Sequence, residues 1–232
     1  MSVPGNFTPV GEFNTIADPL SAARIFALTS PTPNSTMPPA PPVSTRNGSE
    51  EESIPPYPSK DELGDRRLNL ILFPLDITTP HELRRDVFEA KVKPLMDKGS
   101  PLAEWTDAIV GSTLRNTENL HHDQTGDSAY ISLHDPLCVW YALTAASQQK
   151  EWQVTKGEDI RIETAGQWTR GMCVIDRRDR KMRDGDDDDE GSEIPGDSGG
   201  WLGKSKGNRI NRCIGSPGET VLASFMLDTI FG

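Results

Sequence analysis

The sequence of 232 residues has no apolar run long enough to span a bilayer, which takes about 20 consecutive residues in a helix. Its first ten residues, MSVPGNFTPV, also lack the basic and apolar regions of a secretory signal peptide. Both absences argue against a membrane partner. We therefore expect a soluble, cytoplasmic protein.

Cysteine is scarce, since the chain has only Cys138, Cys173 and Cys213. The three residues are far apart, odd in number and without the spacing of metal ligands. Because disulfides belong to oxidising compartments, we expect reduced and mostly buried thiols.

Positive charge is also limited, because 24 Lys and Arg face 35 Asp and Glu, for a net charge of −11. Nucleic-acid-binding proteins need a basic face that neutralises phosphates, so we expect no nucleic-acid partner. Much of the acidic excess lies in the run at 184–190. Such a run is a solvated tract that attracts cations weakly and forms no preorganised cage.

Two stretches, at 30–66 and 177–208, are rich in polar residues and show no apolar period. Segments of this composition cannot bury enough apolar surface to offset the entropy of ordering them. We therefore expect one partial domain over residues 1–232 with two disordered insertions.

Signals for helix starts recur along the remaining sequence. Asp18 and Asp135 each precede a proline, so that Asp caps a helix and Pro takes its first position. Thr79 and Glu82 have the spacing of a capping box. With the apolar spacing that follows, these signals predict helices at 19–28, 80–92, 101–120, 136–146 and 218–231.

Between these helices lie short segments with strand patterns. The apolar run at 68–74 predicts a strand covered on both faces. Segments 160–164 and 171–175 are expected to pair across a turn. Further short strands are predicted at 131–136 and 212–214. Strands that alternate with capped helices indicate an α/β layered fold.

Two clusters carry polar groups that are suited to chemistry. Asn6, Glu12 and Asn14 offer amides and a carboxylate that can bind several hydroxyls, as a sugar would require. Glu12 and Asn14 would point the same way if their segment is extended. His134 and Asp135 follow a predicted strand, where an imidazole can donate a proton to a departing group. The alternative is that Asp135 only caps a helix and His134 is a hydrogen-bonded structural residue.

Together these clusters resemble the inosine-uridine preferring nucleoside hydrolase family. The similar stretches, in order, are GNFTPVGEFNTIADPLSAARIF (5–26), LILFPLDITT (70–79), LHDPLCVWYAL (133–143), TAGQWTRGMCVID (164–176) and GSPGETVLASFML (215–227). The resemblance implies an incomplete nucleoside hydrolase-like, Rossmann-like layered sheet with flanking helices. It also implies hydrolysis of the N-glycosidic bond of ribonucleosides to base and ribose.

The resemblance assigns roles to both clusters. It implies that Asn6, Glu12 and Asn14 hold ribose hydroxyls, that His134 protonates the leaving base, and that Asp135 ligates calcium. His122 would lie in a segment near the base and contact it, although an exposed histidine at a helix end is the alternative. Trp140 and Tyr141 we interpret as core residues and not as base-stacking residues.

The sequence departs from the family pattern in one respect, because no DTDPGxDD loop occurs in it. That loop supplies further calcium ligands and the base that activates water. Calcium takes six to eight oxygens, so Asp135 alone cannot form the site. We therefore expect impaired hydrolysis of the nucleoside, or a non-catalytic nucleoside- or ribose-binding module. An incomplete sheet would also favour self-association, as a homo-oligomer or with a full-length relative.

A third hypothesis comes from GDSGG at 196–200, which reproduces the string around the nucleophile of trypsin-like proteases. The string lies in the second predicted insertion, and the sequence shows no two-barrel pattern to place a His and an Asp against Ser198. Short strings match by chance, so we disfavour a protease.

Overall fold

The computed structural model describes residues 5–38, 67–120, 125–149, 151–182 and 195–232. The chain divides into two compact units, residues 1–72 with 155–212 and residues 73–154 with 213–232. Strands β4 (Gln153–Glu158) and β7 (Ile210–Gly215) each continue from one unit into the other. No helix among the described residues has the length and apolarity needed to cross a membrane.

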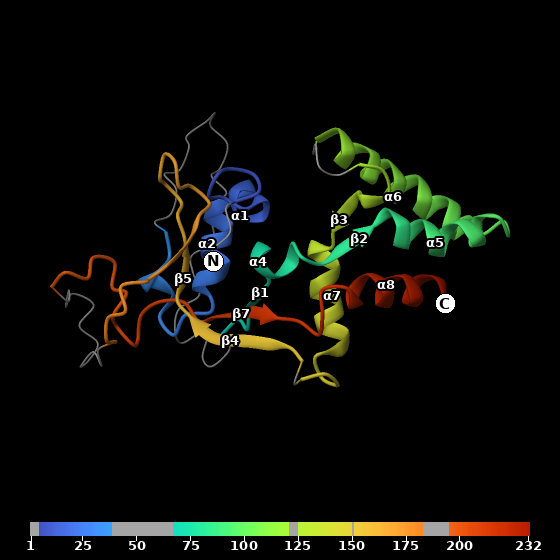
Figure 1. Ribbon diagram of the computed structural model, residues 1–232. Coiled ribbons are helices and arrows are strands. Elements are labelled where there is room, and N and C mark those ends of the chain that lie inside the picture. The colour runs from blue at the N-terminus through green and yellow to red at the C-terminus, as the bar shows by residue number, and fades with distance from the viewer. Residues whose placement is uncertain (1–4, 39–66, 121–124, 150, 183–194) are drawn as a thin grey trace, which may run out of the picture. The chain divides into compact units, whose positions relative to one another are not determined.

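The first unit packs one helix against a β-hairpin. Strands β5 (Ile160–Ile162) and β6 (Cys173–Ile175) pair antiparallel, with Ile160 opposite Ile175. Helix α2 (Pro19–Ala27) lies against β5 (Figure 1). Burying the apolar face of α2 against this hairpin removes both surfaces from water. The buried residues of this core are Ala23, Phe26, Ile160, Ile162 and Ile210.

The described part of the first unit has two further short helical elements, α1 (Phe13–Ala17) and the 3-10 helix η1 (Pro33–Ser35). A three-stranded sheet has the order β1-β7-β4, where β1 (Ile71–Leu72) runs parallel to β7. Strand β1 is shorter than the predicted strand at 68–74, and its two residues are half-buried, so the expectation of cover on both faces is wrong.

The second unit is mainly helical. Its elements, in chain order, are α4 (Leu75–Thr78), β2 (Glu82–Arg84), α5 (Arg85–Met96), α6 (Pro101–Leu120), η2 (Gly126–Ser128), β3 (Tyr130–Ser132), α7 (His134–Thr144) and α8 (Val221–Phe231). Trp140 of α7 is at the centre of the core, with its ring centroid 5.1 Å from that of Trp152. The structure therefore confirms Trp140 as a core residue, and Tyr141 packs against the same core.

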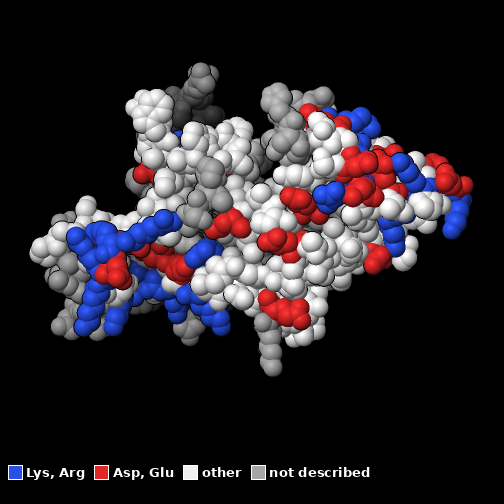
Figure 2. Space-filling model, in the orientation of Figure 1, with Lys and Arg blue, Asp and Glu red and all other residues white. Residues whose placement is uncertain are grey.

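Helices α5 and α6 form a helical hairpin through Gly99. Gly99 has a φ of 76°, the left-handed conformation that ends helices at glycine. Its N–H donates to the carbonyl of Met96, and that of Ser100 donates to Leu95. Charged side chains gather over α5 and α6, whereas the surface over α8 is largely uncharged (Figure 2).

Several predicted elements are confirmed and two are corrected. The helices at 19–28, 101–120 and 218–231 are present, as are the hairpin and the last strand. The helix predicted from Pro80 begins instead at Arg85, because residues 82–84 pair antiparallel with 130–132 as β2 and β3. The helix predicted from Pro136 begins at His134. The α/β class is confirmed, with the strands distributed over three small sheets.

The predicted insertions are described only in part, at 30–38 and at 177–182 with 195–208. Asp197 is buried there and accepts hydrogen bonds from Arg178 Nη2 at 3.0 Å and Leu202 N at 2.8 Å. The remaining residues of both predicted insertions, among them the acidic run at 184–190, lie outside the described part of the chain. Their disorder stays a prediction.

All three cysteines are free, as predicted. Cys213 is buried and Cys173 is half-buried, and burial raises the pKa of the Cys173 thiol to about 12. Cys138 is exposed on α7, so the expectation of burial is wrong for this residue, which lies on the side of the helix away from the core.

His81 is a completely buried titratable group in the second unit. Its Nδ1 lies 2.8 Å from the carbonyl oxygen of Ile77, and its Nε2 lies 2.9 Å from the hydroxyl of Ser216. Burial lowers the pKa of His81 below its ordinary value of 6.5, although the Ile77 carbonyl and the charge of Glu219 oppose this shift.

We predict that His81 makes the stability of the protein depend on pH. Below pH 6.5 the unfolded chain binds a proton at this residue while the folded chain resists it. The contribution of His81 to the free energy of unfolding should therefore be largest above pH 6.5. It should fall as the pH drops toward the lowered pKa of the folded state. Urea unfolding of the wild type and of His81→Gln, which does not titrate, measures the effect. Equal pH slopes in the two proteins would contradict the prediction.

Candidate functional site

The opening cluster is folded into a helix start. Glu12 is the N-cap of α1, and its carboxylate accepts from the backbone N–H groups of Asn14 at 2.9 Å and Thr15 at 3.3 Å. The Oδ1 atom of Asn6 accepts from the backbone N–H of Phe13 at 2.9 Å. The segment is therefore not extended, and the expectation that strand geometry aligns Glu12 and Asn14 is wrong.

Capping nevertheless brings the predicted ribose-binding groups together. Asn14 Nδ2 donates to Glu12 Oε1 at 3.0 Å, so an amide and a carboxylate are side by side. Asn6 and Asn14 are exposed and Glu12 is half-buried. Since Asn6 and Glu12 both bond to the start of α1, the structure places all three residues in one polar cluster of the first unit.

A buried hydrogen bond ties this cluster to the hairpin of the same unit. Thr15 Oγ1 donates to the carbonyl oxygen of Gly171 at 2.7 Å. Gly171 has a φ of 83°, and a Cβ atom there would lie 2.9 Å from Ile16 Cδ1. The close approach of the hairpin to α1 therefore requires glycine at this position. Two of the stretches that carry the family resemblance, 5–26 and 164–176, meet here.

The second cluster lies at the start of α7. His134 is the first residue of this helix, and its Nδ1 lies 2.8 Å from Thr78 Oγ1. Its ring is half-buried, and no hydrogen bond to Nε2 is formed by any residue that the structure describes. His134 is therefore held at one ring nitrogen and has the other available.

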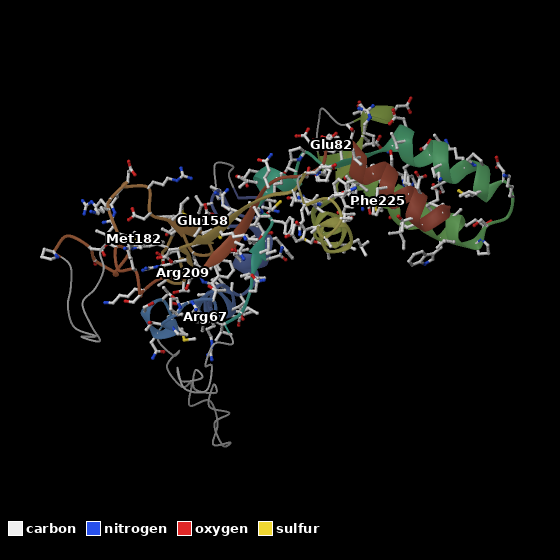
Figure 3. All side chains as sticks on the ribbon, turned by 90° about the horizontal axis from the view of Figure 1, so that it is seen from below. Arg67, Glu82, Glu158, Met182, Arg209 and Phe225 are labelled. Carbon is white, nitrogen blue, oxygen red and sulfur yellow. The ribbon has the colours of Figure 1, made fainter. Side chains whose placement is uncertain are left out.

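Asp135 follows on the first turn of α7 and is exposed. The N-cap position belongs to Leu133, so the interpretation of Asp135 as a cap is wrong. Its side chain borders an open groove of about 380 Å³ between α7 and α8. The other residues that line this groove are Pro136, Val139, Trp140, Leu143, Leu222, Phe225, Met226, Thr229 and Ile230. Phe225 is labelled on α8 in Figure 3.

The donor groups around Asp135 do not fit a calcium ion. Asp135 is the single carboxylate on a groove whose other lining residues are apolar apart from Thr229. Among the described residues, no three His, Cys, Asp or Glu side chains are grouped closely enough to hold a metal. Calcium requires six to eight oxygen ligands, which the described residues around Asp135 do not supply.

The predicted site residues therefore form two local groups. Asn6, Glu12 and Asn14 belong to the first unit, whereas His134 and Asp135 are neighbours in the second. His122 lies outside the described residues. Thr78 was missed by the sequence analysis, although it lies within the similar stretch at 70–79.

The string at 196–200 offers no protease site within its own unit. Asp197 is held by Arg178 and Leu202, and the exposed Ser198 follows it. The four histidines of the sequence all fall in the residue ranges of the second unit. The unit that contains Ser198 therefore has no histidine that could act as its base.

The helices and small sheets define a mixed α/β protein. A family model described as inosine-uridine preferring nucleoside hydrolase matches residues 1–194. The chain belongs to this family, which supports nucleoside hydrolase-type activity in general. No curated protein matches the chain. The similar stretch at 215–227 lies beyond the matched residues and stays a prediction.

We predict that the Glu12 carboxylate stabilises the first unit as the N-cap of α1. Glu12→Ala removes the acceptor for two backbone N–H groups and should lower the free energy of unfolding by about 1 kcal/mol. Glu12→Gln keeps an oxygen in place and should stay within about 0.5 kcal/mol of the wild type. Urea unfolding measures both values. Equal losses in the two variants would show that the cap does not explain the stability of this segment.

Proposed function

We propose that this chain binds ribonucleosides and cleaves their N-glycosidic bond, with slow turnover as the 232-residue polypeptide. Family membership over residues 1–194 supports the reaction class. The observation that carries the proposal is His134, held through Nδ1 by Thr78 and with Nε2 unbonded among the described residues. A half-buried imidazole arranged in this way is suited to proton donation.

In this proposal the described residues have distinct tasks. Cleavage moves the electron pair of the glycosidic bond onto the leaving base and leaves positive charge on the ribose, and a water molecule then bonds to the anomeric carbon and loses a proton to the solvent. The His134 imidazolium gives its Nε2 proton to a nitrogen of the base, so that the base departs neutral. The amides of Asn6 and Asn14 and the carboxylate of Glu12, in the first unit, are suited to bind ribose hydroxyls.

A second function is favoured by the donor groups at Asp135, which do not fit calcium. Without a group that activates water, bound nucleoside persists uncleaved. The chain would then be a non-catalytic nucleoside- or ribose-binding module. Binding without release of base distinguishes this function from slow hydrolysis.

We predict that changes in the two clusters affect binding and turnover differently. His134→Gln should slow base release at least roughly 100-fold, since it removes the general acid, while inosine still binds. Glu12→Gln should weaken ribose binding roughly tenfold, because it replaces a charged acceptor by a neutral one. Calorimetric titration with inosine and ribose measures binding, and absorbance under single-turnover conditions with protein in excess measures base release.

Cys138→Ser is the matched control, because Cys138 is exposed on the same helix as His134. This variant should bind and release base like the wild type. Binding of inosine without release of base by the wild type would favour the non-catalytic module. No heat with either inosine or ribose would contradict both functions.

A further inference from the structure

We infer that Thr78 is a positioning residue for His134, whose hydroxyl fixes the imidazole with Nε2 as the reactive nitrogen. The inference rests on the proposed function for the role of His134 and on the structure for the contact itself. Thr78 Oγ1 and His134 Nδ1 are 2.8 Å apart, although 56 positions separate the two residues in the sequence. Nothing in the local sequence around either residue requires this contact.

Thr78 is a rigid anchor for such a bond. It is the last residue of α4, only 3% exposed, and its backbone N–H donates to the carbonyl of Pro74 at 3.1 Å. The carbonyl of Thr78 accepts from the N–H of His81 at 3.2 Å. Because the backbone is held on both sides and threonine is stiff at χ1, its hydroxyl has a fixed direction.

The backbone of His134 is held against the same segment. The N–H of Leu133 donates to the carbonyl oxygen of His81 at 2.7 Å, and Ser132 Oγ donates to the carbonyl oxygen of Thr79 at 3.2 Å. The residues before His134 are thus joined to the residues after Thr78. The Thr78 hydroxyl then restricts the rotation of the His134 ring.

A hydroxyl suits this task because it can donate or accept. It accepts from Nδ1–H both in the doubly protonated ring and in the ring that has lost its Nε2 proton, and it donates to Nδ1 in the tautomer that carries its proton at Nε2. The contact is therefore retained before and after the ring gives a proton away at Nε2. A buried hydroxyl also loses stability when left unpaired, which favours the bonded ring orientation.

The test compares Thr78→Val, which has nearly the same shape without the hydroxyl, with Thr78→Ser, which restores it. The ¹⁵N signals of the His134 ring, recorded at one pH where the ring is neutral, report the bond without any substrate. Nδ1 should show the shift of a hydrogen-bonded nitrogen in the wild type and Thr78→Ser, and that of an unbonded nitrogen in Thr78→Val. The rate of base release at saturating inosine should fall about threefold to tenfold in Thr78→Val, with KM little changed, and Thr78→Ser should recover most of it.

Thr144→Val is the control for loss of a buried hydroxyl in the same unit. Thr144 lies at the end of α7, and its Oγ1 accepts from Trp152 Nε1 at 3.1 Å. This variant should lose stability but keep the His134 signals and the rate. Identical Nδ1 signals in the wild type and Thr78→Val would overturn the inference whatever the activity. A changed signal with an unchanged rate would overturn the positioning role.

A failure of the proposed function can be told apart from a failure of the inference about Thr78. If the wild type neither binds inosine nor releases base, the function is contradicted, and a catalytic role for Thr78 is overturned with it. The ¹⁵N comparison still decides whether the hydroxyl holds the ring, because that measurement needs no ligand.

Discussion

In the second unit, a backbone hydrogen bond from the N–H of Leu133 to the carbonyl of His81 joins the segments that carry His134 and Thr78. Buried backbone groups must find partners, and this pair ends the β2–β3 ladder where α7 begins. The bond sets the start of α7 at His134 and brings its side chain within reach of Thr78. Burial of the His81 side chain, bonded to Ile77 and Ser216, keeps the accepting segment in place.

The polar cluster of the first unit is held mainly by contacts between residues that are close in the sequence, unlike the Thr78–His134 contact of the second unit. Glu12 satisfies N–H groups that the short helix α1 leaves free, and in doing so it lies against the Asn14 amide. One long-range bond, from Thr15 to Gly171, then attaches the cluster to the hairpin. In the proposed function, ribose hydroxyls would therefore have to share the Glu12 carboxylate with the N–H groups that it caps.

Local sequence signals predicted a helix start correctly where no long-range strand pairing competed with the helix. Asp18 and Pro19 predicted the start of α2, and the Asp18 carboxylate does accept from the N–H of Ser21 at 3.0 Å. A comparable signal at Thr79 and Glu82 failed, because residues 82–84 gain more by pairing with 130–132 than by forming a helical turn. The Thr78–His134 contact had no local signal at all, since it depends on the same distant pairing.

The two clusters differ in what their surroundings allow. In the proposed function His134 needs a fixed ring with one nitrogen available, and the β2–β3 pairing together with the Thr78 contact fixes this ring. Activation of water would need a further base or a metal, and the groove beside Asp135 presents apolar side chains in place of additional oxygens. Hydrolysis needs both departure of the base and addition of water to the ribose. In the proposed function, protonation of the base therefore has a described residue, His134, whereas activation of water has none among the described residues that line this groove.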